Sequence, residues 1–321
     1  MPVLEVQQLH LKIHETEILR GIDFSLEPAQ TLGLAGESGC GKTMIGMALM
    51  GMIPAGGRIT KGSITLDGRS LTELPARQYA DIRGSEIAMV MQDPFTSLNP
   101  VMRVGEQVAE AIVLHRDKSW SEARRLAVDL LDKVGIPDPE ASARKYPHQL
   151  SGGQRQRVVI AIAFSCHPKV LIADEPTTAL DVTLQAQVLR LLKTLQEEEG
   201  TAVVIISHNI GVIAAVSDDI GIVYAGQIVE MGSATQVLKS PKHPYTQGLL
   251  NALPKLDKSR LNSIPGSPPD FAKLGGDCAF RPRCEHAHEA CLVAPGKIGV
   301  DPGHHVRCWL YAEANQMADR S

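Results

Sequence analysis

A glycine-rich octapeptide constrains this chain more than any other feature of its sequence. Residues 36–43 read Gly-Glu-Ser-Gly-Cys-Gly-Lys-Thr and fit the pattern G-x-x-x-x-G-K-[ST]. The apolar stretch Thr31–Ala35 before them is typical of a buried strand, and residues 44–52 after them are predicted to be helical. In this strand–loop–helix context the pattern holds the phosphates of a nucleoside triphosphate. The chain is therefore predicted to contain an α/β nucleotide-binding core.

The residue types of this loop suit phosphate binding. Glycines allow backbone angles that other residues resist, so that amide N–H groups can point inward at phosphate oxygens. Lys42 supplies a positive charge to the β- and γ-phosphates, the Thr43 hydroxyl can ligate Mg²⁺, and the helix adds the positive end of its dipole. The predicted nucleotide-binding residues here are Gly36, Ser38, Gly39, Cys40, Gly41, Lys42 and Thr43.

Two adjacent acids follow the predicted strand over residues 170–173. At a strand end the chain can turn both side chains toward the nucleotide, although neighbours within a strand point to opposite faces. Asp174 is predicted to hold Mg²⁺, directly or through water, and Glu175 to polarise the attacking water as a general base. In isolation, two exposed acids at a strand end would be the simpler interpretation. The phosphate loop makes the catalytic interpretation the stronger one.

Two further polar residues follow predicted strands. Gln92 comes after residues 89–91, and its amide could reach both Mg²⁺ and the attacking water. His208 comes after a strand over 203–206, in a position to contact the γ-phosphate or the water. Each carries little weight alone, because a single histidine after a strand is usually structural. Both are predicted to be catalytic here, and Gln92 is also a predicted Mg²⁺ ligand.

The order of predicted elements indicates an α/β core with a helical insertion at about 94–163. One inserted helix is well marked, because Ser119 and Glu122 form a capping box before residues 123–134 and Gly135 ends the pattern. Beyond residue 235, repeated prolines break up any regular pattern. We therefore predict a core domain over 1–235 and a separate small extension over 236–321.

Residues 150–154, Leu-Ser-Gly-Gly-Gln, precede a predicted helix over 154–164 and form a second candidate anion site at a helix N-terminus. With this motif the sequence resembles the ATP-binding subunits of ABC transporters. The family's motifs occur in the family's order: the phosphate loop, Gln92, Leu150–Gln154, Asp174-Glu175, Ala179-Leu180-Asp181 and His208. The resemblance covers roughly the first three-quarters of the chain closely.

The resemblance implies a P-loop NTPase core of ABC type, with an antiparallel β subdomain, a helical subdomain and a cysteine-rich C-terminal extension. It implies ATP and Mg²⁺ as cofactors and ATP hydrolysis coupled to transport. One chain holds one phosphate loop and one signature, so two chains must pair head to tail to enclose two ATP molecules. The residues implied to face ATP held by the partner, or to couple the two sites, are Ser151, Gly152, Gly153, Gln154 and Asp181.

The adenine contact departs from the family pattern. The family usually stacks an aromatic side chain on the base just after the first strand, whereas this chain has Ile13 and His14 in that region. Ile13 is therefore assigned as the base contact, through apolar packing.

Three segments resemble importers of dipeptides, oligopeptides and nickel: residues 92–100, 146–149 and 243–247. Peptides are the predicted cargo, with nickel or another small solute as the alternative. The implied partners are two transmembrane permease subunits and a second ATP-binding subunit, for which a different chain is favoured over a copy. A substrate-binding protein would act indirectly. The expected location is the cytoplasmic face of the bacterial inner membrane, as a peripheral subunit.

Six cysteines occur in a chain without a recognisable signal peptide or transmembrane stretch. In a reducing compartment they are expected to be thiols or metal ligands rather than disulfides. The resemblance implies a [4Fe–4S] cluster on four of them, with zinc or free thiols as alternatives. The four are Cys278, Cys284, Cys291 and Cys308.

Composition bears on the competing classes of function. A net charge of −4 and an aromatic content of 4% argue against a nucleic-acid partner. The main rival, a soluble ABC-type ATPase acting on DNA or ribosomes, usually carries two nucleotide-binding units or basic surfaces. An iron–sulfur sensor would not explain the segment around Gln92, and the C-terminal segment argues against an exporter.

Overall fold

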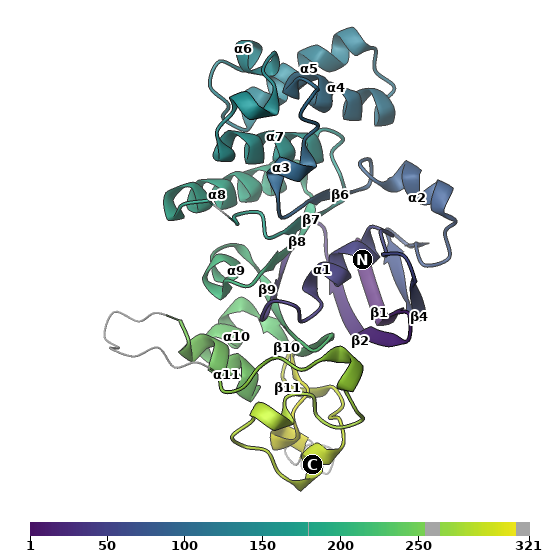
Figure 1. The fold of residues 1–321 in the computed structure, drawn as a ribbon, viewed down its shortest axis with the longest axis vertical. Coiled ribbons are helices and arrows are strands. Elements are labelled where there is room, and N and C mark those ends of the chain that lie inside the picture. The colour runs from purple at the N-terminus through teal and green to yellow at the C-terminus, as the bar shows by residue number, and fades with distance from the viewer. Residues whose placement is uncertain (179, 254–263, 313–321) are drawn as a thin grey trace.

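The computed structural model describes residues 1–178, 180–253 and 264–312. Two β-sheets form the body of the molecule, a helical part lies at one end and the C-terminal extension at the other (Figure 1). None of the helices in these described ranges has both the length and the apolar character of a membrane span.

The strands are β1 (Leu4–Ile13), β2 (Thr16–Leu26), β3 (Thr31–Ala35), β4 (Gly57–Leu66), β5 (Arg69–Ser70), β6 (Ile87–Val90), β7 (Val170–Asp174), β8 (Ala202–Ser207), β9 (Asp219–Tyr224), β10 (Gln227–Ser233), β11 (Ile298–Asp301) and β12 (His304–Val306). The α-helices are α1 (Lys42–Leu49), α2 (Ala76–Ile82), α3 (Pro94–Ser97), α4 (Val104–His115), α5 (Trp120–Lys133), α6 (Pro139–Ala143), α7 (Gly152–Phe164), α8 (Val182–Glu199), α9 (Ile210–Val216), α10 (Ala234–Lys239) and α11 (Pro244–Asn251). Short 3₁₀ turns are η1 (Pro147–Gln149), η2 (Phe271–Lys273), η3 (Arg281–Arg283), η4 (Glu289–Leu292) and η5 (Trp309–Tyr311).

The larger sheet has eight strands in the order β11-β12-β10-β9-β3-β8-β7-β6. Strands β9, β3, β8, β7 and β6 run parallel to their neighbours in that order. Their near-continuous apolar sequences are typical of strands covered on both faces, and β3, β7 and β8 are buried throughout. Because the carboxyl ends of parallel strands meet at one edge, the loops that follow β3, β6, β7 and β8 gather there.

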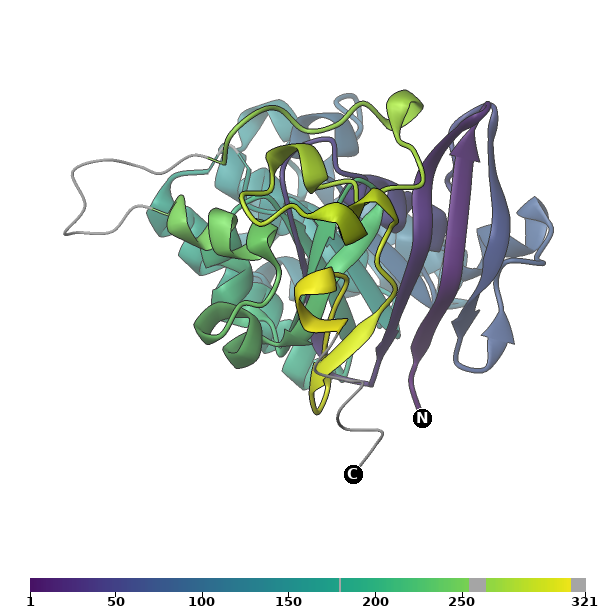
Figure 2. The same ribbon diagram turned by 90° about the horizontal axis from the view of Figure 1, so that it is seen from below.

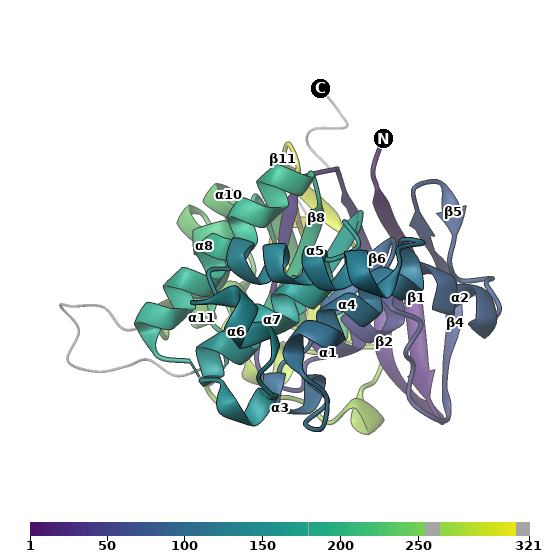
Figure 3. The same ribbon diagram turned by 90° about the horizontal axis from the view of Figure 1, so that it is seen from above.

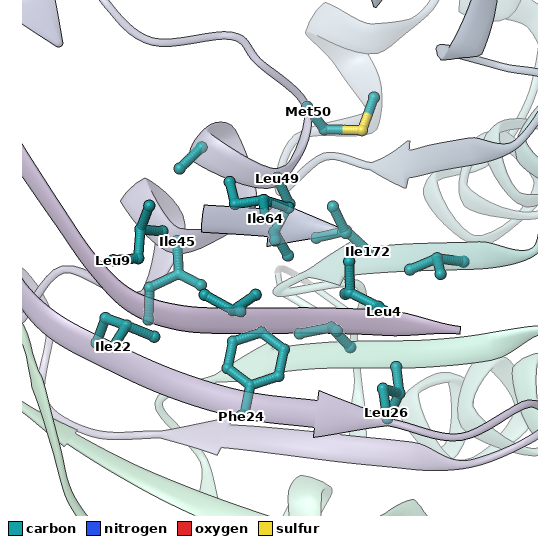
Figure 4. Packing of buried hydrophobic residues seen from close by; sticks show 14 of the residues in the cluster. Leu4, Leu9, Ile22, Phe24, Leu26, Ile45, Leu49, Met50, Ile64 and Ile172 are labelled. Carbon is teal, nitrogen blue, oxygen red and sulfur yellow. The ribbon is translucent and has the colours of Figure 1, made fainter. Parts of the chain in front are cut away.

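The smaller sheet is antiparallel, with the order β2-β1-β4-β5. Its inner face packs against α1, where Ile45 lies among Leu9, Ile22 and other buried apolar side chains (Figure 4). Burying one such side chain contributes about 1.5–3 kcal/mol. This packing fixes the start of α1, and with it the loop that precedes the helix.

The helical part contains α3 to α7 and lies in front of the strands when the molecule is seen from above (Figure 3). Its helix α7 contacts β6, the edge strand of the larger sheet. Apolar side chains of α4, α5 and α7, such as Ile112 and Leu131, belong to one buried cluster with residues of β6, β7 and β8. The helical part therefore shares its core with one face of the larger sheet. The capping box on α5 is confirmed, since Ser119 Oγ accepts from Glu122 N at 3.3 Å and Ser119 N donates to Glu122 Oε2 at 3.2 Å.

The C-terminal extension contains regular structure, and the expectation that its prolines break every pattern is wrong. Helices α10 and α11 form between 234 and 251. Pro244 occupies the first turn of α11, where a missing N–H removes no intrahelical bond, and the His243 side chain caps the helix by accepting from Tyr245 N.

The extension also lengthens the core sheet. In β12, Val306 lies opposite Glu230 of β10, and β11 pairs with β12 in turn (Figure 2). Residues 298–306 thus add two strands to the sheet of the nucleotide-binding core. The division of the chain into domains at 235/236 stays a prediction.

Candidate nucleotide-binding and catalytic site

The phosphate loop connects β3 to α1, as predicted from its sequence. Gly41 precedes α1 with a φ of 105°, a backbone conformation that disfavours other residues. Gly36 has a different requirement, because a Cβ there would lie 2.2 Å from the Val223 carbonyl oxygen. The glycines of the motif therefore let the chain turn tightly against β9 and enter the helix at Lys42.

Lys42 is 5% exposed and folds over the loop. Its Nζ donates to the carbonyl oxygens of Gly36 and Glu37, both at 2.8 Å. The ammonium group is thus held at the loop itself, where it can contact bound phosphate. Thr43, the next residue, is exposed at the start of α1.

Asp174 ends β7 and is 3% exposed. Within the described residues its Oδ1 has no hydrogen-bond partner. Burial raises the pKa of Asp174, while hydrogen bonding with Thr43 opposes that rise. A buried carboxylate oxygen without a partner, beside a hydroxyl, is a donor set that fits Mg²⁺. These two residues therefore fit the metal that the sequence motif implies.

Glu175 is fixed by two neighbours. His208 Nδ1 lies 2.7 Å from its Oε1 and 2.8 Å from its Oε2, and Thr178 Oγ1 donates to Oε2 at 2.7 Å. Burial raises the pKa of Glu175, but the hydrogen bonds from His208 and Thr178 more than offset it, and the net pKa is lowered. The backbone of Glu175 has a φ of 48°, which is unusual for a residue with a side chain and typical of functional sites.

Two other predicted site residues lie at strand ends, one in each sheet. Gln92 follows β6, whose last residue pairs with Ala173 of β7, so Gln92 and the two acids leave neighbouring strands at the same edge. Its side chain is exposed. Ile13 ends β1 opposite Thr16 and is partly buried. Its assignment as an adenine contact stays a prediction.

The signature motif begins α7, in the helical part, while the phosphate loop lies beside the sheets (Figure 1). Ser151 Oγ accepts from Gln154 N at 3.3 Å, and Ser151 N donates to Gln154 Oε1 at 3.0 Å. Gly152 and Gly153 are the first two residues of the helix. Asp181 caps α8 by accepting from Leu184 N at 2.9 Å, whereas Ala179 of the same motif lies outside the described residues.

Thr178 was not predicted from the sequence. It lies three residues after Glu175, and this spacing alone does not predict that its hydroxyl donates a hydrogen bond to the Glu175 carboxylate. The turn between β7 and α8, in which Thr178 N donates to the Glu175 carbonyl oxygen at 3.1 Å, brings the two side chains together.

The four cysteines of the extension line one cavity, together with His286 and His288. All are free thiols, and burial raises the pKa of Cys278, of Cys284 and of Cys308, the last to about 11. In the ranges that the structure describes, no three Cys, His, Asp or Glu side chains are arranged to hold a single metal ion. The structure therefore does not confirm a metal centre here.

Comparison with known proteins identifies the class. Residues 19–178 match the ABC transporter family. The dimeric bacterial ABC transporter cassette MJ0796 aligns with a TM-score of 0.64 and 26% identity, over 72% of this chain and 98% of that one. The cbiO1 protein from Clostridium perfringens, part of the transporter complex cbiONQ, aligns with a TM-score of 0.65 over 74% and 91%. The fold and the site define an ABC-type P-loop ATPase.

Residues 229–291 match the oligopeptide/dipeptide transporter C-terminal region. The oligopeptide transport ATP-binding protein OppD of Salmonella typhimurium is 45% identical over 317 residues, covering 97% of this chain and 94% of that protein. OppD of Escherichia coli is 47% identical over 91% and 87%, and the dipeptide transport ATP-binding protein DppD of Bacillus subtilis is 42% identical over 98% and 97%. The chain belongs to the oligopeptide/dipeptide branch of the ABC transporter ATP-binding subunits.

Proposed function

We propose that this chain hydrolyses ATP to power the import of peptides through a membrane-embedded complex. The observation that carries the hydrolytic role is the Glu175 carboxylate, held by His208 and Thr178 beside the buried oxygen of Asp174. The names of the similar proteins support peptides as the cargo and favour them over nickel.

Each residue of the site has a part in this reaction. Lys42 and the loop amides bind the β- and γ-phosphates. Asp174, Thr43 and Gln92 would hold Mg²⁺, which neutralises charge on the phosphates when it is bound. Glu175 accepts a proton from the attacking water, and His208 keeps the carboxylate ionised and oriented toward it.

A complete site needs a second ATP-binding subunit. The signature residues Ser151 to Gln154 lie at the start of α7, away from the loop of their own chain (Figure 1). They would therefore meet the γ-phosphate of ATP held by the partner, with Asp181 at the same interface. Two nucleotides are then enclosed between head-to-tail subunits. We favour a partner of different sequence, and a copy of this chain is the alternative.

A methionine-lined groove of about 470 Å³ lies between the sheet edge and the helical part. We propose that each of two permease subunits docks a helix in such a groove of one ATPase, at the cytoplasmic face of the bacterial inner membrane. Flexible thioether side chains adapt well to a partner helix, and Leu114 on the groove is 70% exposed. A substrate-binding protein would act through the permeases. The methionines of the groove are Met50, Met52, Met89, Met91 and Met102.

We also propose a [4Fe–4S] cluster on the four cysteines of the extension. The support is their family-like spacing and their convergence on one cavity. Four irons hold their thiolates further apart than one ion does, so a geometry unsuited to a single ion is compatible with a cluster.

Affinity purification of the chain from its native membranes, followed by mass spectrometry, tests the transport role. We expect two multi-span subunits, a second ATPase and a peptide-binding protein. Leu114→Glu should lose the permeases, whereas Arg125→Glu, on an exposed part of α5 outside the groove, should retain them. Recovery of ribosomes or DNA-repair proteins instead would contradict the proposal.

A further inference from the structure

The phosphate loop is tied to the C-terminal extension through Glu37. Arg283 Nη1 donates to Glu37 Oε2 at 2.6 Å and Nη2 donates to Oε1 at 2.9 Å, so the two groups form a two-point ion pair. The backbone N–H of Glu37 donates to the Tyr245 hydroxyl at 2.9 Å. Both partners belong to the extension, yet Glu37 is the second residue of the phosphate motif.

Arg283 is held rigidly where it makes this pair. Its side chain is 4% exposed, and its Nε donates to the Pro265 carbonyl oxygen at 2.8 Å. The guanidinium lies near the rings of Tyr224 and Phe280. Its Cζ is 5.9 Å from the centre of the Tyr224 ring and 6.0 Å from that of Phe280. A cation that is buried and fixed at several points has lost its side-chain freedom on folding, so it holds its carboxylate partner in one place.

The charge of Glu37 explains why such a partner is needed. A free carboxylate in a loop built to bind the β- and γ-phosphates would repel them, and a partly buried charge is poorly screened by salt. Arg283 cancels this charge. The Glu37 carbonyl also accepts from Lys42 Nζ at 2.8 Å, so the place of Glu37 bears directly on the lysine that contacts phosphate.

We propose that Arg283 is a positioning residue for the ATPase reaction, which neutralises Glu37 and holds the phosphate loop in its nucleotide-binding form from within the C-terminal extension. The extension of this chain is thereby part of the nucleotide site rather than an appendage to it. The inference rests on the proposed nucleotide site.

The test measures MgATP affinity of the full chain by calorimetry, and KM and kcat of the assembled transporter. Arg283→Met leaves Glu37 charged and unpaired, and should weaken MgATP binding about tenfold and raise KM more than it lowers kcat. Adding Glu37→Gln to Arg283→Met removes the unpaired charge and should restore affinity to within about twofold of the wild type. A purely structural role for Arg283 would give no such rescue.

Arg281→Met is the matched control, because Arg281 lies in the same 3₁₀ turn and pairs with Asp277 at 3.0 Å, away from the loop. It should bind MgATP as the wild type does. If Arg283→Met does not fold, Arg283→Lys keeps the charge but loses the two-point geometry, and should give an intermediate loss. Wild-type affinity in the Arg283 variants, or a double variant as weak as the single one, overturns the proposal. Lys42→Ala tests the nucleotide site separately, because it should weaken MgATP binding whether or not Arg283 positions the loop. If Lys42→Ala also bound MgATP like the wild type, the proposed nucleotide site itself would be wrong.

Discussion

His208 and Glu175, which are 33 residues apart in the sequence, meet through one ring nitrogen and both carboxylate oxygens at distances of 2.7 and 2.8 Å. The contact joins the loops that follow β8 and β7, two neighbouring parallel strands. It holds the carboxylate in a fixed orientation and favours its ionised form. Both properties suit a general base, because the base must be unprotonated and aimed at the water when ATP binds.

Glu175→Gln should lower the turnover of ATP by about 10²–10⁴-fold, because an amide cannot accept the proton from the attacking water. The change keeps shape and leaves Lys42 in place, so ATP binding should persist and a closed dimer should accumulate. Steady-state ATPase rates and size-exclusion chromatography with ATP measure the two effects. Glu15→Gln, in an exposed turn, is the control and should change neither. Normal hydrolysis by Glu175→Gln would remove Glu175 from the role of base.

His208→Ala should move the acid limb of the kcat–pH profile to higher pH. The hydrogen bonds from His208 and Thr178 lower the pKa of Glu175 from its ordinary 4.5, so the wild-type base stays ionised until the pH falls below that value. Without the His208 bond, burial raises the pKa, and protonation removes the base at a higher pH. Thr178→Val should shift the limb in the same direction. An acid limb that stays in place in both variants would show that these contacts do not set the pKa.

Lys42→Ala should weaken MgATP binding about tenfold or more, because charge-assisted contacts to phosphate are among the stronger hydrogen bonds in proteins. Equilibrium binding of MgATP to the purified chain measures the loss. Glu175→Gln serves as the contrast, since it should retain affinity while losing turnover. A Lys42→Ala chain that binds MgATP as tightly as the wild type would contradict the assignment of the phosphate site.

The parts of the site that lie at strand ends were predictable from the sequence. Each buried strand reads as a short apolar run, and the polar residue after it must emerge at the edge where parallel strands end. This reasoning placed Asp174, Glu175 and His208 after strands. In the structure Asp174 is the last residue of β7, while Glu175 and His208 directly follow β7 and β8. The capping box at Ser119 was equally readable, because its signal lies within four residues.

The contacts between distant segments were not predictable. Arg283 and Glu37 are 246 residues apart, and no local pattern links a turn among cysteines to the phosphate loop. Strands β11 and β12 are only four and three residues long, so their alternation is too short to signal a place in the core sheet. The prediction that prolines prevent regular structure after residue 235 failed at Pro244 for another reason. A proline breaks a helix interior but is compatible with a helix start.

The cysteine-rich extension should contain iron and sulfide when the protein is purified without oxygen. Because four thiols line one cavity, a bound cluster would give a brown protein with broad visible absorbance. Cys284→Ser should lose iron, whereas Cys166→Ser, in the core domain, should keep it. A colourless anaerobic preparation without iron would contradict the cluster, and one equivalent of zinc would favour the alternative metal.

Thiol modification of Cys40 should block ATP hydrolysis, and bound ATP should protect against it. Cys40 is 4% exposed, and its sulfur lies 3.6 Å from Lys42 Nζ, so an adduct would displace the lysine from the loop. Burial raises the pKa of Cys40 above its ordinary 9.0, although Lys42 opposes this. Since the thiolate is the reactive form, modification by methyl methanethiosulfonate should be slow at neutral pH and should accelerate as the pH rises.

Mass spectrometry of the tryptic peptide measures Cys40 occupancy alongside residual ATPase activity. A Cys40→Ala chain should keep its activity under the same treatment, which separates the loop thiol from the five other cysteines, all of which are also free. Complete modification of Cys40 with full retained activity would show that the sulfur does not bear on the loop. If the thiol reagent still inactivated the Cys40→Ala chain, the sensitive thiol would lie elsewhere, and the cysteines of the extension would be tested first.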